Sequence, residues 1–183
     1  MEHVAWARDL ARQLLAEALP TRWAHTQGVA RAAESIADIV DEDAETLICA
    51  AWLHDIGYAP GLAQTGFHPL DGARYLRDKQ RADERLCRLV AHHSCAVIEA
   101  GKRSLAAELV AEFPPVGGLV AEALTYCDMT TSPRGEPVDV QQRLREILGR
   151  YGKGSIVAES IAQARTEIER SARLVSAAVA QRR

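Results

Sequence analysis

Five of the six histidines in this chain belong to short polar segments, and an isolated aspartate follows an apolar segment farther along. These residues are His25, the pair His54-Asp55, His68, the pair His92-His93 and Asp128. Neutral imidazole nitrogens and carboxylate oxygens are common ligands of divalent transition metals. Their joint occurrence at helix-compatible positions predicts a metal centre and a metalloenzyme built around it.

The elements that must position these residues are predicted to be helices. Apolar residues recur with a helical rather than an alternating period, and Ala, Leu, Arg and Glu outnumber the residues that favour strands. We therefore predict an all-α bundle of about seven or eight helices. The expected helices cover about residues 3–18, 22–40 with Thr21 as cap, 44–53, one from His68, one up to His92-His93, one carrying Asp128, 138–150 and 155–181.

Each polar group is expected at a buried position or at a helix end. His25 falls on the inward face of its helix, and His54-Asp55 follow the continuously apolar segment 47–53. His68 opens a new helix, because the proline after it suits a first helical turn. A buried, unpaired carboxylate such as Asp128 would cost several kcal/mol, and a bound metal would offset that cost.

His92 and His93 cannot serve one ion equally well. Adjacent side chains on a helix point about 100° apart, so one of the two is expected to bind metal and the other to contact substrate. We assign His92 to the metal and His93 to catalysis, with a half-exposed supporting position as the alternative for His93. His3 stands outside every cluster and is expected at the surface.

Length and composition indicate a single domain over residues 1–183. The chain has 183 residues, of which 48% are hydrophobic and 26% are charged, which is enough for one proper core. Residues 138–183 are expected to form a C-terminal helical extension. Its apolar stripe should pack back on the core, although a homodimer seam is the alternative.

The same composition narrows the partners and the compartment. A formal net charge of −3 gives no basic field for nucleic acid, so a small substrate is favoured. No apolar run reaches the roughly 18 residues of a membrane span, and early charges exclude a secretory signal. The four cysteines form no CxxC pair, as in a reducing compartment. We expect a cytoplasmic protein without membrane contacts.

The order of these motifs resembles the HD-domain superfamily of metal-dependent phosphohydrolases. His25, His54-Asp55 and Asp128 match its histidine, His-Asp pair and distal aspartate, within a core of about residues 21–131. The segments 54–57 (HDIG) and 68–73 (HPLDGA), with His92, resemble the subset that binds two metals. The resemblance implies two divalent ions of Fe, Mn, Co, Ni or Zn, iron or manganese favoured. The implied ligands are His25, His54, Asp55, His68, His92 and Asp128, with Asp55 as the bridge.

The resemblance also implies a reaction. A water activated by both ions would attack phosphorus in a phosphate ester or anhydride of a small, nucleotide-like substrate. Asp55 and His93 are the implied catalytic residues, and Arg22 and Arg134 the expected phosphate contacts. The segment 94–98 replaces the Gly-Tyr-Pro of cyclic-dinucleotide phosphodiesterases, which argues against those substrates. Bacterial HD hydrolases of symmetrical dinucleoside polyphosphates are closer analogues.

Two other functions use the same residues. Some HD-fold proteins hold a mixed-valence di-iron centre in a set of four histidines and two aspartates and cleave a carbon bond with oxygen. Oxygen consumption without phosphate release would identify that chemistry. A nucleotide-sensing module is the third possibility, but such a degenerate enzyme is expected to lack a ligand, and here every position is filled.

Overall fold

Helices make up the fold of residues 2–182, the part of the chain that this computed structural model describes. That part contains no β-strand, and its one isolated bridge joins Thr131 to Pro137. The prediction of an all-α fold is confirmed. The α-helices are α1 (Glu2–Leu15), α2 (Pro20–Ile36), α3 (Ala44–Leu53), α4 (His68–Tyr75), α5 (Glu84–His92), α6 (Ala96–Lys102), α7 (Ala106–Glu112), α8 (Leu119–Met129), α9 (Val140–Tyr151) and α10 (Ile156–Arg182). Short 3₁₀ and π turns are η1 (Ala37–Asp43), η2 (Ile56–Tyr58), η3 (Leu76–Gln80) and η4 (His93–Cys95).

Several boundaries differ from those expected. Thr21 does not cap α2, because Pro20 already occupies the first turn of the helix and Leu19 stands at the N-cap. The same helix ends at Ile36 and continues as the 3₁₀ turn η1, within which Asp41 has a left-handed φ of 47°. The short helices α6 and α7 were not predicted, since seven residues hold barely two turns of periodic pattern.

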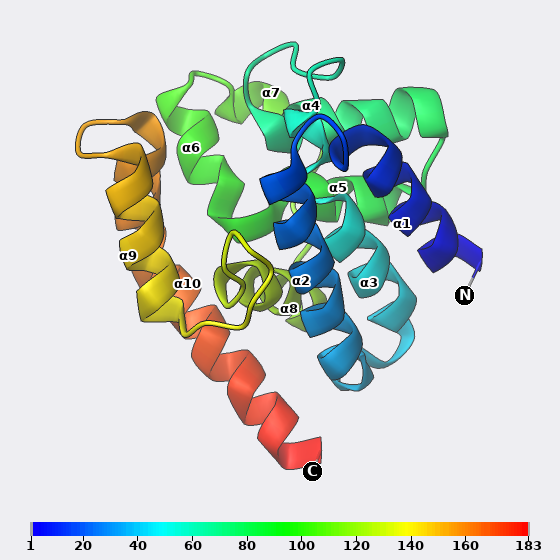
Figure 1. Cartoon of the computed structure of the whole chain (residues 1–183), viewed down its shortest axis with the longest axis vertical. Coiled ribbons are helices and arrows are strands. Elements are labelled where there is room, and N and C mark those ends of the chain that lie inside the picture. The colour runs from blue at the N-terminus through cyan, green and yellow to red at the C-terminus, as the bar shows by residue number, and fades with distance from the viewer. Residues whose placement is uncertain (1, 183) are drawn as a thin grey trace.

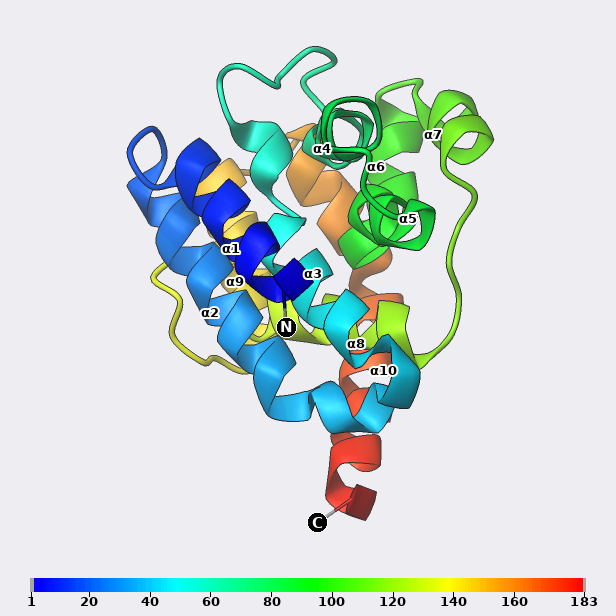
Figure 2. The same cartoon turned by 90° about the vertical axis from the view of Figure 1, so that its right-hand side faces the viewer.

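Helix α3 forms the centre of the bundle. It packs against α1, α2, α5 and α8 (Figures 1 and 2). A helix that is apolar all round has no face suited to water, so it is stable only when other elements surround it. Its buried residues are Leu47, Cys49, Ala50, Ala51, Trp52 and Leu53. The polar residues that follow Leu53 are therefore delivered into the interior.

Helices α9 and α10 pack beside the end of α8. They share a small apolar cluster with it, formed by Met129, Leu144, Ile147, Ala164 and Ile168. Helix α10 runs along the bundle, and its last turns extend beyond it (Figure 1). The stripe on α10 thus packs within the chain, and α9 lies near the aspartate that α8 carries. None of the helices in residues 2–182, α10 included, is long and apolar enough to cross a membrane.

Candidate metal centre

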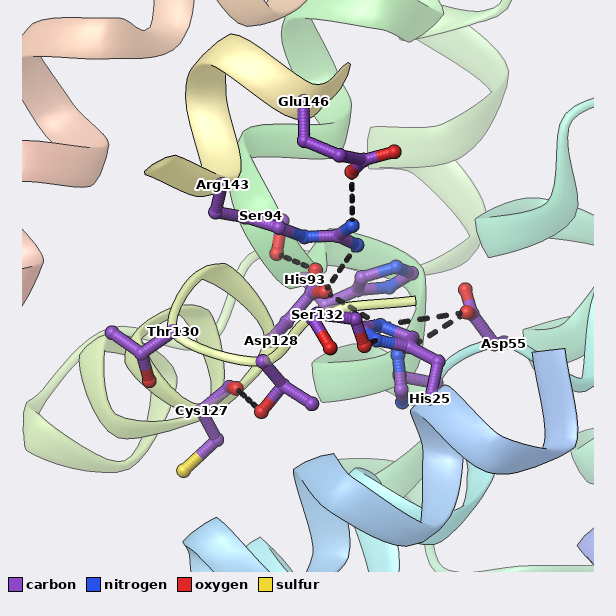
Figure 3. Close-up of polar contacts among 12 residues, drawn as sticks. His25, Asp55, His93, Ser94, Cys127, Asp128, Thr130, Ser132, Arg143 and Glu146 are labelled. Carbon is purple, nitrogen blue, oxygen red and sulfur yellow. Dashed lines mark hydrogen bonds and ion pairs between the residues drawn. The ribbon is translucent and has the colours of Figure 1, made fainter. Parts of the chain in front are cut away.

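Six side chains that are far apart in the sequence gather into two adjacent groups. In each group the possible ligand atoms lie within 4.8 Å of one another. All but His68 are buried, and His68 is half-buried. The close-up in Figure 3 shows several of these side chains converging from different helices. The first group is His25, His54 and Asp128, and the second is Asp55, His68 and His93.

His25 is held by a loop that lies directly on α2. A Cβ atom on Gly28 would lie 2.5 Å from Cα of Gly135, and one on Gly135 would lie 2.2 Å from the Ala24 carbonyl oxygen. The loop and the helix can approach this closely only because both residues are glycines, which have no Cβ atom. Gly135 also has a positive φ of 77°, a conformation that favours glycine. The close contact brings the Ser132 carbonyl within 3.0 Å of His25 Nδ1.

Backbone carbonyls orient three of the four histidines in the same way. Nδ1 of His25 contacts Ser132 O at 3.0 Å, Nδ1 of His54 contacts Ala51 O at 2.8 Å, and Nδ1 of His93 contacts Val90 O at 2.7 Å. A carbonyl oxygen only accepts hydrogen bonds, so each Nδ1 carries the hydrogen and donates it. When such a ring is neutral, its Nε2 keeps a free lone pair, which is the form that binds metals.

Two of these Nε2 atoms lie close to other polar atoms of the cluster. His25 Nε2 lies 3.0 Å from Asp128 Oδ1, and His93 Nε2 lies 3.2 Å from His68 Nε2. His54 Nε2 is fully buried and has no hydrogen-bond partner in the described part of the chain. A lone pair that faces a carboxylate, as at His25, or that lacks a hydrogen bond in the interior, as at His54, is satisfied when a cation binds beside it. The six residues therefore fit a metal centre of nitrogen and oxygen ligands.

Asp55 stands between the two groups. Its Oδ1 lies 3.3 Å from His68 Nε2, and its Oδ2 lies 3.4 Å from His54 Nε2 and 4.0 Å from His25 Nε2. Burial favours the neutral acid, but Arg22, His54 and His68 outweigh it and hold the pKa of Asp55 well below its usual value. The carboxylate is ionised and could bridge two cations, one through each oxygen.

The charge states of Asp128, His68 and His93 also suit ligation. At His54, by contrast, burial is outweighed by the effect of Asp55 and Asp128, which raises the pKa, so a metal must displace a proton there. Burial favours neutral Asp128, but its contacts with His25, His54 and Arg143 keep its pKa well below the usual value. Burial lowers the pKa of His68 well below its usual value and also lowers that of His93. Both rings are therefore neutral near pH 7, as metal ligands must be.

His93, and not His92, lies in the cluster, which corrects the sequence-based choice between them. Helix α5 ends at His92, whose Nε2 lies 2.5 Å from the Phe113 carbonyl oxygen, outside both groups. The chain then turns through Ser94 and Cys95, which both have left-handed φ values, 49° and 62°. That turn brings the Ser94 hydroxyl to Asp128 Oδ2, a contact that no sequence pattern indicated.

The structure supports one of the two expected phosphate-binding positions. Arg22 Nη1 donates to Asp55 Oδ2 at 2.7 Å, and its guanidinium lies 4.0 Å from the centre of the Tyr58 ring. Arg134 is exposed, and its backbone N–H donates to Ser132 Oγ. Its side chain lines neither of the two cavities beside the centre. The prediction that Arg134 contacts phosphate is therefore not supported by its position.

Two cavities adjoin the candidate centre. The smaller, about 80 Å³, is lined by Asp55, His68, His93 and Asp128. The larger, about 300 Å³, lies against His25 and the start of α2. Arg22 lines both, and so do two residues of α9 that the sequence did not single out, Arg143 and Arg150.

A tight backbone contact joins the segment after His54-Asp55 to the start of α4, which carries His68. A Cβ atom on Gly57 would lie 2.0 Å from the His68 carbonyl oxygen and 2.7 Å from Gly72 N. We expect Gly57→Ala to destabilise the protein by about 3 kcal/mol, the upper range for overpacking, because backbone atoms must move. The measurement is the free energy of unfolding in denaturant.

Gly61→Ala is the matched control for that variant. Gly61 follows in the next loop, and a Cβ atom there would meet nothing within 4 Å. Its effect should stay within about 0.5 kcal/mol. Equal stabilities of the two variants would show that the approach of Gly57 to His68 does not constrain the fold.

The HD domain family profile matches residues 22–124 of this chain, which is more than half of it. The chain therefore belongs to the HD domain family, as its motifs suggested. That family consists mostly of metal-dependent phosphohydrolases. No curated protein and no solved structure matches the chain significantly. Asp128 and both C-terminal helices lie beyond the matched residues.

Proposed function

We propose that this protein is a metal-dependent phosphohydrolase that hydrolyses a phosphate ester or anhydride of a small, nucleotide-like molecule. The observation that carries the proposal is the pairing of two ligand groups around one carboxylate. Asp55 directs one oxygen toward His68 and the other toward His54, and in three of the histidines a hydrogen bond from Nδ1 leaves Nε2 available to a cation. Membership of the HD domain family supports the same reaction class.

Two divalent transition metal ions, iron or manganese favoured, would be shared between the groups. His25, His54 and Asp128 would hold one, His68 and His93 the other, and Asp55 both. When bound, such ions activate a water molecule and neutralise charge on phosphate oxygens. This assignment gives His93 the ligand role first expected of His92, and His92 has no part in the centre.

The protein side chains supply the rest of the site. The carbonyls of Ala51, Val90 and Ser132 keep three histidine rings in the tautomer that binds metal. Arg22 holds Asp55 in its ionised form and lines both cavities, so it is placed to meet a phosphate oxygen. The Tyr58 ring stacks on His68 with the centroids 3.9 Å apart and covers its outer face.

A small substrate fits the site better than a macromolecule does. The cavities beside the centre hold about 300 Å³ and about 80 Å³, which is the scale of a small phosphorylated molecule. The negative net charge offers no general attraction for nucleic acid. The proposal includes a cytoplasmic location, and it leaves a homodimer open.

The test combines metal analysis with a substrate screen. The purified protein, loaded separately with manganese and with iron, is analysed for metal per chain. It is then assayed for phosphate release from nucleotides, dinucleoside polyphosphates and simple phosphate esters. We expect two metals per chain and phosphate release that chelation abolishes. Oxygen consumption by the iron form without phosphate release would instead indicate the oxygenase, and nucleotide binding without turnover the sensing module.

A further inference from the structure

Two arginines from α9 reach the cavities beside the metal centre. Arg143 and Arg150 line both the larger and the smaller cavity. They lie beyond residue 124, where the match to the HD domain ends. Helix α9 therefore adds cationic groups to a centre built by other helices.

Arg143 is a buried cation with unused hydrogen-bonding capacity. Its side chain is only 4% exposed. Nη1 donates to Glu146 Oε2 at 2.6 Å, and Nη2 lies 3.7 Å from Asp128 Oδ1, beyond hydrogen-bond distance (Figure 3). Nε is buried and lacks any partner within residues 2–182. Buried donors are rarely left unpaired, so a guanidinium at a cavity wall whose Nε lacks a partner indicates room for an anionic ligand.

Glu146 positions both arginines. Its Oε2 accepts from Arg143, and its Oε1 lies 3.2 Å from Arg150 Nε. The three residues stand at i, i+3 and i+7 on α9, so they share one face of the helix. One carboxylate thus aligns two guanidinium groups along the boundary between the cavities.

The charge in this region leaves room for a multiply charged anion. The protein groups balance one another before any metal binds, so two divalent ions would add positive charge that the described carboxylates of the cavities do not compensate. A phosphate monoester brings at most about two negative charges, and a diphosphate brings more. The balanced groups are Arg22, Arg143 and Arg150 against Asp55, Asp128 and Glu146, with Glu99 paired to Arg103.

We propose that the substrate carries at least two consecutive phosphoryl groups. The reacting phosphoryl group lies in the smaller cavity at the metal centre, and Arg143 and Arg150 bind the next one. The rest of the molecule occupies the larger cavity, whose walls include Leu19, Pro20 and Pro133. This inference rests on the proposed phosphohydrolase function and narrows its substrates to phosphoanhydrides of the diphosphate class.

The experiment compares two anions that are not hydrolysed. Manganese-loaded protein is titrated calorimetrically with imidodiphosphate and with orthophosphate. We expect imidodiphosphate to bind more tightly. Arg150→Gln should weaken imidodiphosphate binding roughly 10- to 100-fold, the loss of a charge-assisted hydrogen bond, and leave orthophosphate binding unchanged. Arg143→Gln and Glu146→Gln should shift the preference in the same direction, and Arg150→Lys should retain part of it.

Arg145→Gln is the control on the same helix. Arg145 is exposed and lines neither cavity, so this variant should bind both anions as the unaltered protein does. The inference is overturned if Arg150→Gln weakens both anions equally, or neither, while metal content is unchanged. Absence of bound metal would refute the proposed function instead. In that case the same titrations of metal-free protein would test the role of the two arginines. The unaltered protein must still bind imidodiphosphate more tightly than orthophosphate.

Discussion

His54→Ala is expected to lower the metal content from two ions to at most one per chain and to reduce phosphohydrolase activity at least about 100-fold. Mutation of a residue that only hydrogen-bonds to a metal ligand typically costs about 10- to 100-fold in metal affinity or activity. Removal of a metal ligand itself should therefore cost more. His54 suits this test because its buried Nε2 makes no hydrogen bond within the described residues and lies 3.4 Å from the Asp55 carboxylate. Metal analysis and a phosphate-release assay give the two measurements.

His92→Ala is the matched control, since it removes a histidine that lies near the centre but outside both groups. It should keep both metals and nearly full activity. His93→Ala, one residue farther on, should behave like His54→Ala. Circular dichroism should show that all three variants keep their helices. If His54→Ala binds two metals, or if His92→Ala loses one, the assignment of ligands is refuted.

Most of the ligand set could be predicted because its positions follow from local sequence. His54 and Asp55 stand directly after an apolar helix, so burial of that helix carries them inward. His25 is a buried residue of α2, a helix that packs on both α3 and α8. The spacing of apolar residues predicts which residues of a helix face inward and where the helix ends. The structure brings these residues together with His68 and Asp128, as the motifs indicated.

The choice between His92 and His93 could not be made in that way. Both follow the same apolar pattern, and the direction of each side chain depends on the turn after His92. Ser94 and Cys95 take left-handed conformations there, which nothing in their residue types demands. The tertiary environment, and not local preference, sets this part of the centre.

The arginines show a second limit of sequence reasoning. Arg134 is near Asp128 in sequence, but its loop turns the side chain to solvent. Arg143 is farther along, yet α9 returns beside the end of α8 and places its guanidinium 3.7 Å from Asp128. That return depends on packing of apolar residues such as Leu144 and Ile147 in a cluster shared with α10. Separation along the sequence is therefore a poor guide to which arginine lies near Asp128, because the packing of α9 with α10 decides it.

Asp55→Asn is expected to remove both metals, because the amide has no charge and this carboxylate lies against His54 of one group and His68 of the other. Activity should fall at least as far as in His54→Ala, by about 100-fold or more. The substitution keeps the shape of the side chain, so loss of metal would report on its charge. Metal analysis again provides the measurement, and retention of both ions by the Asp55→Asn variant would contradict the bridging role.

The same variant should also lose stability when no metal is present, through its partner Arg22. The guanidinium is 19% exposed and donates to Asp55 Oδ2 at 2.7 Å, so the substitution leaves a mostly buried cation without its counter-ion. Such a loss costs about 3 kcal/mol, partly offset by the contact with the Tyr58 ring. Adding Arg22→Gln to Asp55→Asn should restore most of that stability without restoring metal binding. Denaturant unfolding of the two single variants and the double variant in chelator checks this coupling, and additive losses would show that the two side chains do not depend on each other.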